Sequence, residues 1–88
     1  MTKERIIFGE PFTMQSRKGS TTLTHAEWSL SANGRGIEAA EHEIMLDAAV
    51  FADALDDYGP GELTAEALRM RAFGRICRRH LDAMNLHA

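Results

Sequence analysis

Apolar side chains recur at helical spacing in the second half of this 88-residue chain. They fall three, four and seven positions apart, which is the pattern of a helix with one packed face. Further apolar residues, including Met45 and Val50, widen that face, so we expect two sides of the helix to be covered. The pattern predicts a helix from Ile37 to Tyr58. The repeating positions are Ile37, Ile44, Ala48, Phe51, Leu55 and Tyr58.

A second helix is predicted from Thr64 to Asn85. The sequence Gly59-Pro60-Gly61 ends the first helix, because proline cannot extend a helix and glycine adopts the backbone conformations that a stop requires. Thr64 is a suitable N-cap, since its hydroxyl can accept a hydrogen bond from a free backbone amide. Gly74 lies inside this helix and indicates close approach of another backbone.

Two helices joined by so short a turn are expected to form an antiparallel hairpin over residues 37–85. Pairing outward from Pro60 brings acidic residues of the first helix level with basic residues of the second, on either side of a shared apolar seam. Exposed pairs of this kind select orientation more than they stabilise the fold. The expected pairs are Glu43 with Arg78 or Arg79, Asp47 with Arg75, and Asp53 with Arg69.

Residues 1–36 carry two conflicting signals. Alternation around Phe12 and again over residues 26–30, on either side of a turn at residues 17–20, predicts a short β-hairpin, with an early strand near residues 5–8. Thr24 and Glu27, however, have the spacing of a capping box, which indicates a short helix over residues 24–32. The fold class expected is therefore α+β and mainly helical, with an N-terminal β-hairpin; the alternative is an all-α fold.

The length allows one domain, residues 1–88, because so short a chain cannot support two separate cores. No apolar stretch is long enough to be a signal peptide or to span a bilayer. The single cysteine, Cys77, fits a reducing compartment. We therefore expect a cytoplasmic protein that does not interact with a membrane.

Charge is strongly segregated along the chain. The net charge of −3 divides into +2 for residues 1–36, −9 for residues 37–66 and +4 for residues 67–88. The middle segment contains nine carboxylates and no lysine or arginine. Such a stripe is most often a solvated helix face, although it can also imitate nucleic acid toward a basic partner, and the sequence leaves that question open.

Little in the sequence indicates catalysis or a cofactor. Four residues could approach one another in the hairpin and offer zinc-binding chemistry: Glu38, His42, Cys77 and His80. A lone cysteine on an apolar face is more often a small core residue, so no metal site is assigned. No nucleophile, base and orienting group occur together, and no phosphate-binding loop is present. We expect a protein that is not an enzyme and carries no cofactor.

The function expected is binding of a protein partner, as a small regulator or inhibitor, with a homodimer as one form of that binding. The alternative function is that of a DNA- or RNA-binding regulator that uses the arginine-rich second helix. The acidic net charge makes that second function less favourable. The candidate partner-binding residues are Met45, Phe51, Leu55, Tyr58, Arg71, Arg75, Arg78 and Arg79.

Overall fold

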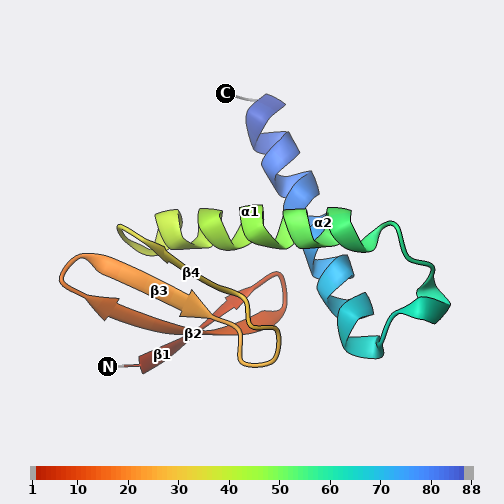
Figure 1. The fold of residues 1–88 in the computed structure, drawn as a ribbon. Helices are drawn as coiled ribbons and strands as arrows, with labels where there is room; N and C mark the ends of the chain where they lie inside the picture. The colour runs from red at the N-terminus through yellow and green to blue at the C-terminus, as the bar shows by residue number, and fades with distance from the viewer. Residues whose placement is uncertain (1, 87–88) are drawn as a thin grey trace. The chain divides into compact units, whose positions relative to one another are not determined.

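The computed structural model describes residues 2–86 and has an α+β fold with a four-stranded antiparallel sheet and two α-helices (Figure 1). The chain divides into two compact units, residues 1–44 and 45–88, and the boundary falls inside the first helix. The elements are β1 (Thr2–Ile7), β2 (Glu10–Arg17), β3 (Ser20–Thr24), β4 (Ser31–Gly34), α1 (Ile37–Leu55), the 3₁₀ helix η1 (Pro60–Glu62) and α2 (Ala65–Leu86).

Unit 1 contains the sheet, in which each strand pairs with its neighbour in the order β1-β2-β3-β4. Two-residue turns join the first three strands, with positive φ at Phe8 and Gly9 and at Lys18 and Gly19. These are the conformations that match the natural twist of a β-hairpin. The predicted turn at residues 17–20 is confirmed, and the early strand is present as β1.

The strand predicted over residues 26–30 and the helix predicted over residues 24–32 are both wrong, because residues 25–30 form a closed turn between β3 and β4. The backbone amide of His25 donates to the carbonyl of Leu30 at 2.8 Å. The Thr24 hydroxyl bonds the Ser31 hydroxyl across the strands at 3.1 Å, while the Glu27 amide donates to His25 Nδ1 at 3.2 Å. The groups needed for a capping box are therefore used in other ways.

The first turns of α1 belong to unit 1 and pack closely against β4. A Cβ atom added at Gly34 would lie 2.4 Å from the backbone nitrogen of Ala40, so only glycine fits there. Arg5 of β1 donates to Glu41 of α1 at 2.9 Å. The core of this unit contains large side chains, and its buried apolar residues are Ile7, Phe12, Leu23, Trp28, Leu30, Ala40 and Ile44.

Unit 2 contains the remainder of α1 together with α2, and the two helices touch through small residues. A Cβ atom at Gly74 would lie 2.3 Å from the Ala48 carbonyl oxygen and 2.6 Å from the Ala52 side chain. The prediction that Gly74 allows close backbone approach is confirmed. Figure 1 shows α2 crossing α1. The buried apolar residues are Ala48, Ala49, Ala52, Phe73, Cys77 and Leu81.

The helix boundaries lie close to the predicted ones. Helix α1 starts at Ile37 as predicted but ends at Leu55, before Tyr58. The N-cap of α2 is confirmed, because the Thr64 hydroxyl accepts a hydrogen bond from the Ala67 amide at 3.0 Å.

The predicted pairing of charges between the helices is wrong in register. Arg75 pairs with Asp56 at 2.6 Å instead of Asp47, and Asp53 pairs with Arg78 at 2.5 Å instead of Arg69. Helices that cross meet over only a few turns, so a register counted outward from Pro60 does not hold along their length. The carboxylates near the end of α1 are therefore the ones that the arginines reach.

Candidate functional site

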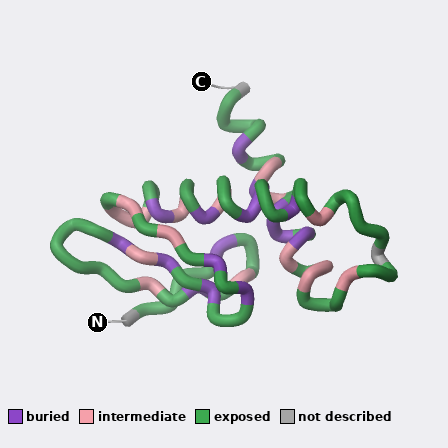
Figure 2. The backbone as a smooth tube through the Cα atoms, in the orientation of Figure 1, coloured by how far each residue is buried: buried purple, intermediate pink, exposed green. Residues whose placement is uncertain are grey.

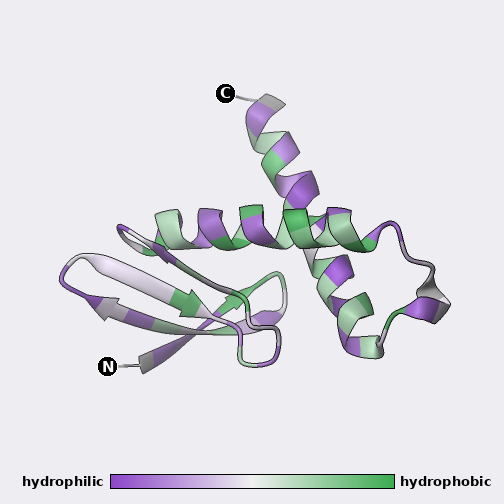
Figure 3. Cartoon of the chain, viewed as in Figure 1, coloured by the Kyte–Doolittle hydropathy of each residue, from purple (hydrophilic) through white to green (hydrophobic). Residues whose placement is uncertain are grey.

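Three large apolar side chains remain in contact with solvent on the part of α1 that lies in unit 2. The exposed fractions are 63% for Val50, 45% for Phe51 and 38% for Leu46. Leu46 and Val50 are four residues apart and so lie on neighbouring turns. Phe51 is rotated about 100° from Val50 around the helix and lies at the far edge of the same exposed side, with the exposed Asp47 between them. We call these three residues the α1 face. Figures 2 and 3 show exposed and hydrophobic positions along this helix.

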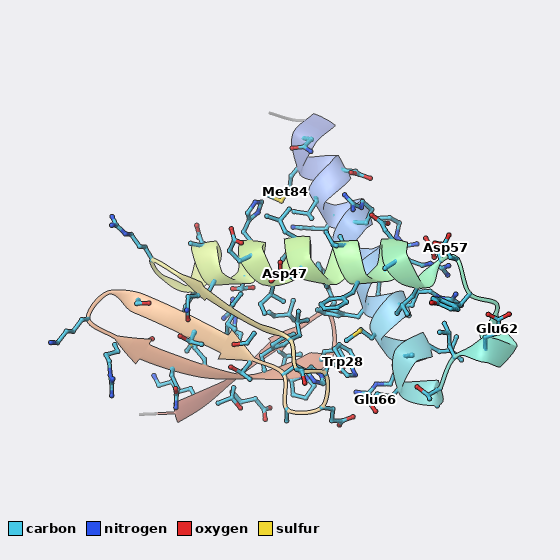
Figure 4. All side chains as sticks on the ribbon, viewed as in Figure 1. Trp28, Asp47, Asp57, Glu62, Glu66 and Met84 are labelled. Atoms are coloured by element: carbon cyan, nitrogen blue, oxygen red, sulfur yellow. The ribbon has the colours of Figure 1, made fainter. Side chains whose placement is uncertain are left out.

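The carboxylate of Asp47 lies within the α1 face in sequence, three and four residues before Val50 and Phe51. Asp57 follows the end of the helix, and Figure 4 labels both side chains. Both residues are exposed. Neither forms an ion pair with any residue in the range 2–86 that the structure describes. The α1 face is therefore an apolar surface bordered by two carboxylates that have no ion pair among the described residues.

Two of the predicted arginines are paired with carboxylates at the end of α1 or directly after it. Arg75 contacts Asp56 and Arg78 contacts Asp53, and all four side chains are substantially exposed. Pairs this exposed contribute only about 0–1 kcal/mol each. Their main effect is to reduce the positive potential that α2 presents to solvent.

Arg71 is buried and contacts the backbone at the end of α1. It is only 8% exposed, and its guanidinium donates to the carbonyl oxygens of Tyr58 at 3.2 Å and Leu55 at 3.4 Å. The last carbonyls of a helix lack partners within the helix and carry partial negative charge, so a buried cation there satisfies both requirements. Arg71 therefore fastens the end of α1 to α2, and it is not part of a solvent-exposed stripe.

The other predicted binding residues are spread over unit 2. Met45 and Leu55 are partly buried, while Tyr58 is 51% exposed and Arg79 is exposed. The structure thus places only Phe51 of the predicted apolar set on the α1 face. Leu46 and Val50 were not among the candidates, although their spacing of four residues was the signal that could have identified them.

A second candidate is a polar hollow of about 420 Å³ on unit 1. Its lining is hydroxyl, amide and guanidinium groups, and Thr22 and Asn33 in it hydrogen-bond to each other. An antiparallel sheet with one packed face normally leaves such a polar face in water. The hollow therefore needs no ligand to explain it. It is lined by Gln15, Ser16, Arg17, Ser20, Thr22 and Asn33.

A third candidate is the buried histidine of unit 1. His25 is 2% exposed, stacks on Trp28 with ring centroids 3.8 Å apart, and meets Phe12 edge-on at 5.2 Å. His25 Nδ1 accepts a hydrogen bond from the Glu27 amide, so the ring proton lies on Nε2. Nε2 donates a hydrogen bond to Glu10 at 3.0 Å. Each ring nitrogen has a partner within the protein, so this histidine orders the turn.

Cys77 is completely buried, and burial raises the pKa of its thiol to about 11, partly offset by a backbone hydrogen bond. Since the thiolate is the reactive form, this side chain is inert at neutral pH. In the part of the chain that the structure describes, no three His, Cys, Asp or Glu side chains are grouped so as to hold a metal ion.

Neither helix within residues 2–86 has the length and apolar character needed to cross a membrane. The comparisons with known proteins add no family: no protein-family model matches the chain, and no curated protein or solved structure is significantly similar to it.

Proposed function

We propose that this chain is a small, non-enzymatic regulator or inhibitor that acts by binding a protein partner through the α1 face. The observation that supports this most strongly is the exposure of Val50, Phe51 and Leu46 on one helix. Side chains of this kind, grouped together and bordered by charge, are typical of a surface that another protein covers.

The energy available on this surface is adequate for a specific but modest interaction. Covering the exposed parts of these three side chains would contribute on the order of 3 kcal/mol, before the cost of association is subtracted. Tyr58 lies beyond the end of α1 and is also half exposed, so it can extend the contact. Tyrosine is among the residues that most often dominate binding energy at interfaces.

The alternative function, nucleic-acid binding through α2, has less support. Arg71 is buried on backbone carbonyls, and Arg75 and Arg78 are paired with carboxylates. A phosphate backbone would have to displace those carboxylates and would also meet the unpaired Asp47 and Asp57. A titration of duplex DNA that showed tight, salt-sensitive binding would reverse this order.

Two finer features belong to the same proposal. The helices of unit 2 form an antiparallel hairpin, which is supported by the order of the ion pairs. Arg75 pairs with Asp56, whereas Arg78, three residues later, pairs with the earlier Asp53, so the two chain directions are opposite. The protein acts in the cytoplasm, which is supported by the unpaired state of its single cysteine.

Affinity capture with substituted chains tests the proposal. The wild-type chain and the Val50→Glu variant are used as baits in cells that express the protein, with nuclease treatment of every lysate and quantitative mass spectrometry. The matched control is Gln15→Glu, which adds the same charge to the exposed surface of the sheet. We expect a protein that is retained by the wild type and the control but lost with Val50→Glu.

Retention of the same proteins by all three baits would contradict the proposal, as would loss of every specific protein after nuclease treatment. Circular dichroism of the purified variants shows whether each one is folded. Val50 is mostly exposed, so its substitution is expected to leave the fold intact.

A further inference from the structure

The α1 face combines two properties that constrain the chemistry of its partner. Its apolar part, Leu46, Val50 and Phe51, is 38–63% exposed. Two carboxylates lie beside these residues: Asp47, which is interleaved with them along the helix, and Asp57, which follows the helix end. A partner that covers the apolar part also has to approach these carboxylates.

Among the residues that the structure describes, no cation pairs with those two carboxylates. The arginines that reach α1 contact Asp53 and Asp56 instead, at 2.5 Å and 2.6 Å. Burying an ionised carboxylate without a partner is costly, so a surface that covers Asp47 is favourable only when it supplies a positive charge. The ion pairs of unit 2 therefore leave a defined pattern of unmatched negative charge.

A second copy of the chain is a poor occupant of this surface. A two-fold contact through the α1 face would bring the same patch of each copy together, including both Asp47 carboxylates. The whole segment from residue 37 to residue 66 contains no lysine or arginine that could separate them. Like charges placed opposite each other across an interface cost several kcal/mol.

We infer that the α1 face binds a basic amphipathic helix of another protein, with apolar side chains on Leu46, Val50 and Phe51 and lysine or arginine side chains on Asp47 and Asp57. This inference rests on the proposed function and specifies the partner's chemistry. A helix laid along a helix face presents its apolar and charged residues at matching intervals, which suits a surface whose own residues repeat every three to four positions.

The test uses the full chain, labelled with nitrogen-15, and a synthetic peptide of about 18 leucine and lysine residues arranged with helical spacing. Two control peptides are a leucine–glutamate version and a version with the same leucine and lysine content in alternating order. We expect the first peptide to bind, with amide shift changes concentrated at residues 46–51, and to bind at least tenfold more tightly than either control.

Matched substitutions separate the apolar and the charged contributions. Val50→Gln is expected to weaken binding about tenfold, whereas Ala83→Gln, the same kind of change at an exposed position of α2, leaves it unchanged. Asp47→Asn together with Asp57→Asn is expected to weaken binding about tenfold at low salt and much less at about 0.5 M salt. Asp82→Asn is the charge control.

Equal binding of the leucine–glutamate peptide, shift changes away from α1, or equal effects of the control substitutions would overturn the inference. Self-association that increases with concentration and is lost in Val50→Gln would overturn it too, because a second copy would then occupy the face. In that case, or if a captured partner lacks a basic helix, the proposed function still stands. If the capture experiment described above finds no protein whose retention depends on Val50, both the inference and the proposed function are wrong.

Discussion

The two units of this protein are built from different kinds of side chain. The core of unit 1 uses large residues, among them Phe12, Trp28 and Leu30, which fill the space between a sheet and the start of a helix. The helix contact of unit 2 uses Gly74 and alanines, which let two helix backbones come close together. A contact made of small residues leaves more of the large apolar side chains of its helices free to face outward.

The two units also differ in the side chains that they expose to solvent. The polar hollow of the sheet is lined mainly by hydroxyl and amide groups and needs no partner, and the large apolar side chains that unit 1 exposes are Ile6 and Phe8, beside and in the turn between β1 and β2. The α1 face contains Leu46, Val50 and Phe51 in contact with water. The contrast shows where to look for function: unit 1 has buried most of its large apolar side chains, whereas unit 2 has kept several at its surface.

The largest effect is expected at the helix contact. In Gly74→Ala the new methyl group meets the Ala48 carbonyl and the Ala52 side chain, so the helices have to separate. We expect a loss of about 2–3 kcal/mol in the free energy of unfolding, despite the better helix propensity of alanine. Urea denaturation measures it. Gly61→Ala is the control, because nothing lies within 4 Å there, and an equal loss in both variants would contradict the description of unit 2.

A smaller loss is expected from the aromatic cluster of unit 1. His25→Ala removes the stack on Trp28 and the hydrogen bonds to Glu10 and to the Glu27 amide. We expect a decrease of about 2 kcal/mol in unfolding free energy. The exposed His42→Ala variant, measured in the same way, is expected to lose almost nothing. A stable His25→Ala protein would show that the turn is held by other contacts.

Arg71 tests the link between the two helices of unit 2. Arg71→Met keeps much of the volume of the side chain but removes the donors to Leu55 and Tyr58. We expect a loss of about 1–2 kcal/mol and faster amide exchange near the end of α1, at residues 52–58. The control is Arg79→Met on the exposed side of α2. Unchanged exchange at residues 52–58 would mean that the carbonyls are satisfied without this arginine.

The smallest effect at neutral pH is that of Cys77, whose contribution to stability changes only at alkaline pH. Its pKa is about 11 in the folded protein, against 9.0 when it is unperturbed, so the unfolded chain loses this proton first as the pH rises. Stability from the neutral buried thiol is complete below pH 9 and decreases between pH 9 and pH 11, by an amount on the order of 2 kcal/mol at the upper end of that range. In Cys77→Ala this part of the decrease should disappear. Parallel curves for the two proteins would contradict the assignment.

The sequence predicted the helical half of the fold better than the sheet. The start of α1 at Ile37, the cap at Thr64 and the close approach at Gly74 each depend on local chemistry or on one steric requirement, which a sequence displays directly. The turn at residues 25–30 depends on the stack of His25 and Trp28 and on a pair of hydroxyl groups across two strands. Those contacts exist only once the sheet has formed.

The candidate site was predicted only in part. Apolar spacing identified α1 as a helix with more than one apolar side, but it could not show which side another helix covers, and so Val50 was missed. Charge counting located the acidic and basic blocks, but the reach of each arginine depends on how the helices cross. For that reason Arg71, expected at a binding surface, occupies the end of α1 instead.

The most direct test of the central claim compares the surfaces of the two units in living cells. A photo-reactive amino acid is placed at Val50 of α1 or at Gln15 of the sheet, both exposed, and cross-linked products are separated by mass after irradiation. Binding through the α1 face predicts one discrete protein adduct from position 50 and none from position 15. A discrete adduct from position 15 alone would place the functional surface on the sheet and contradict the claim.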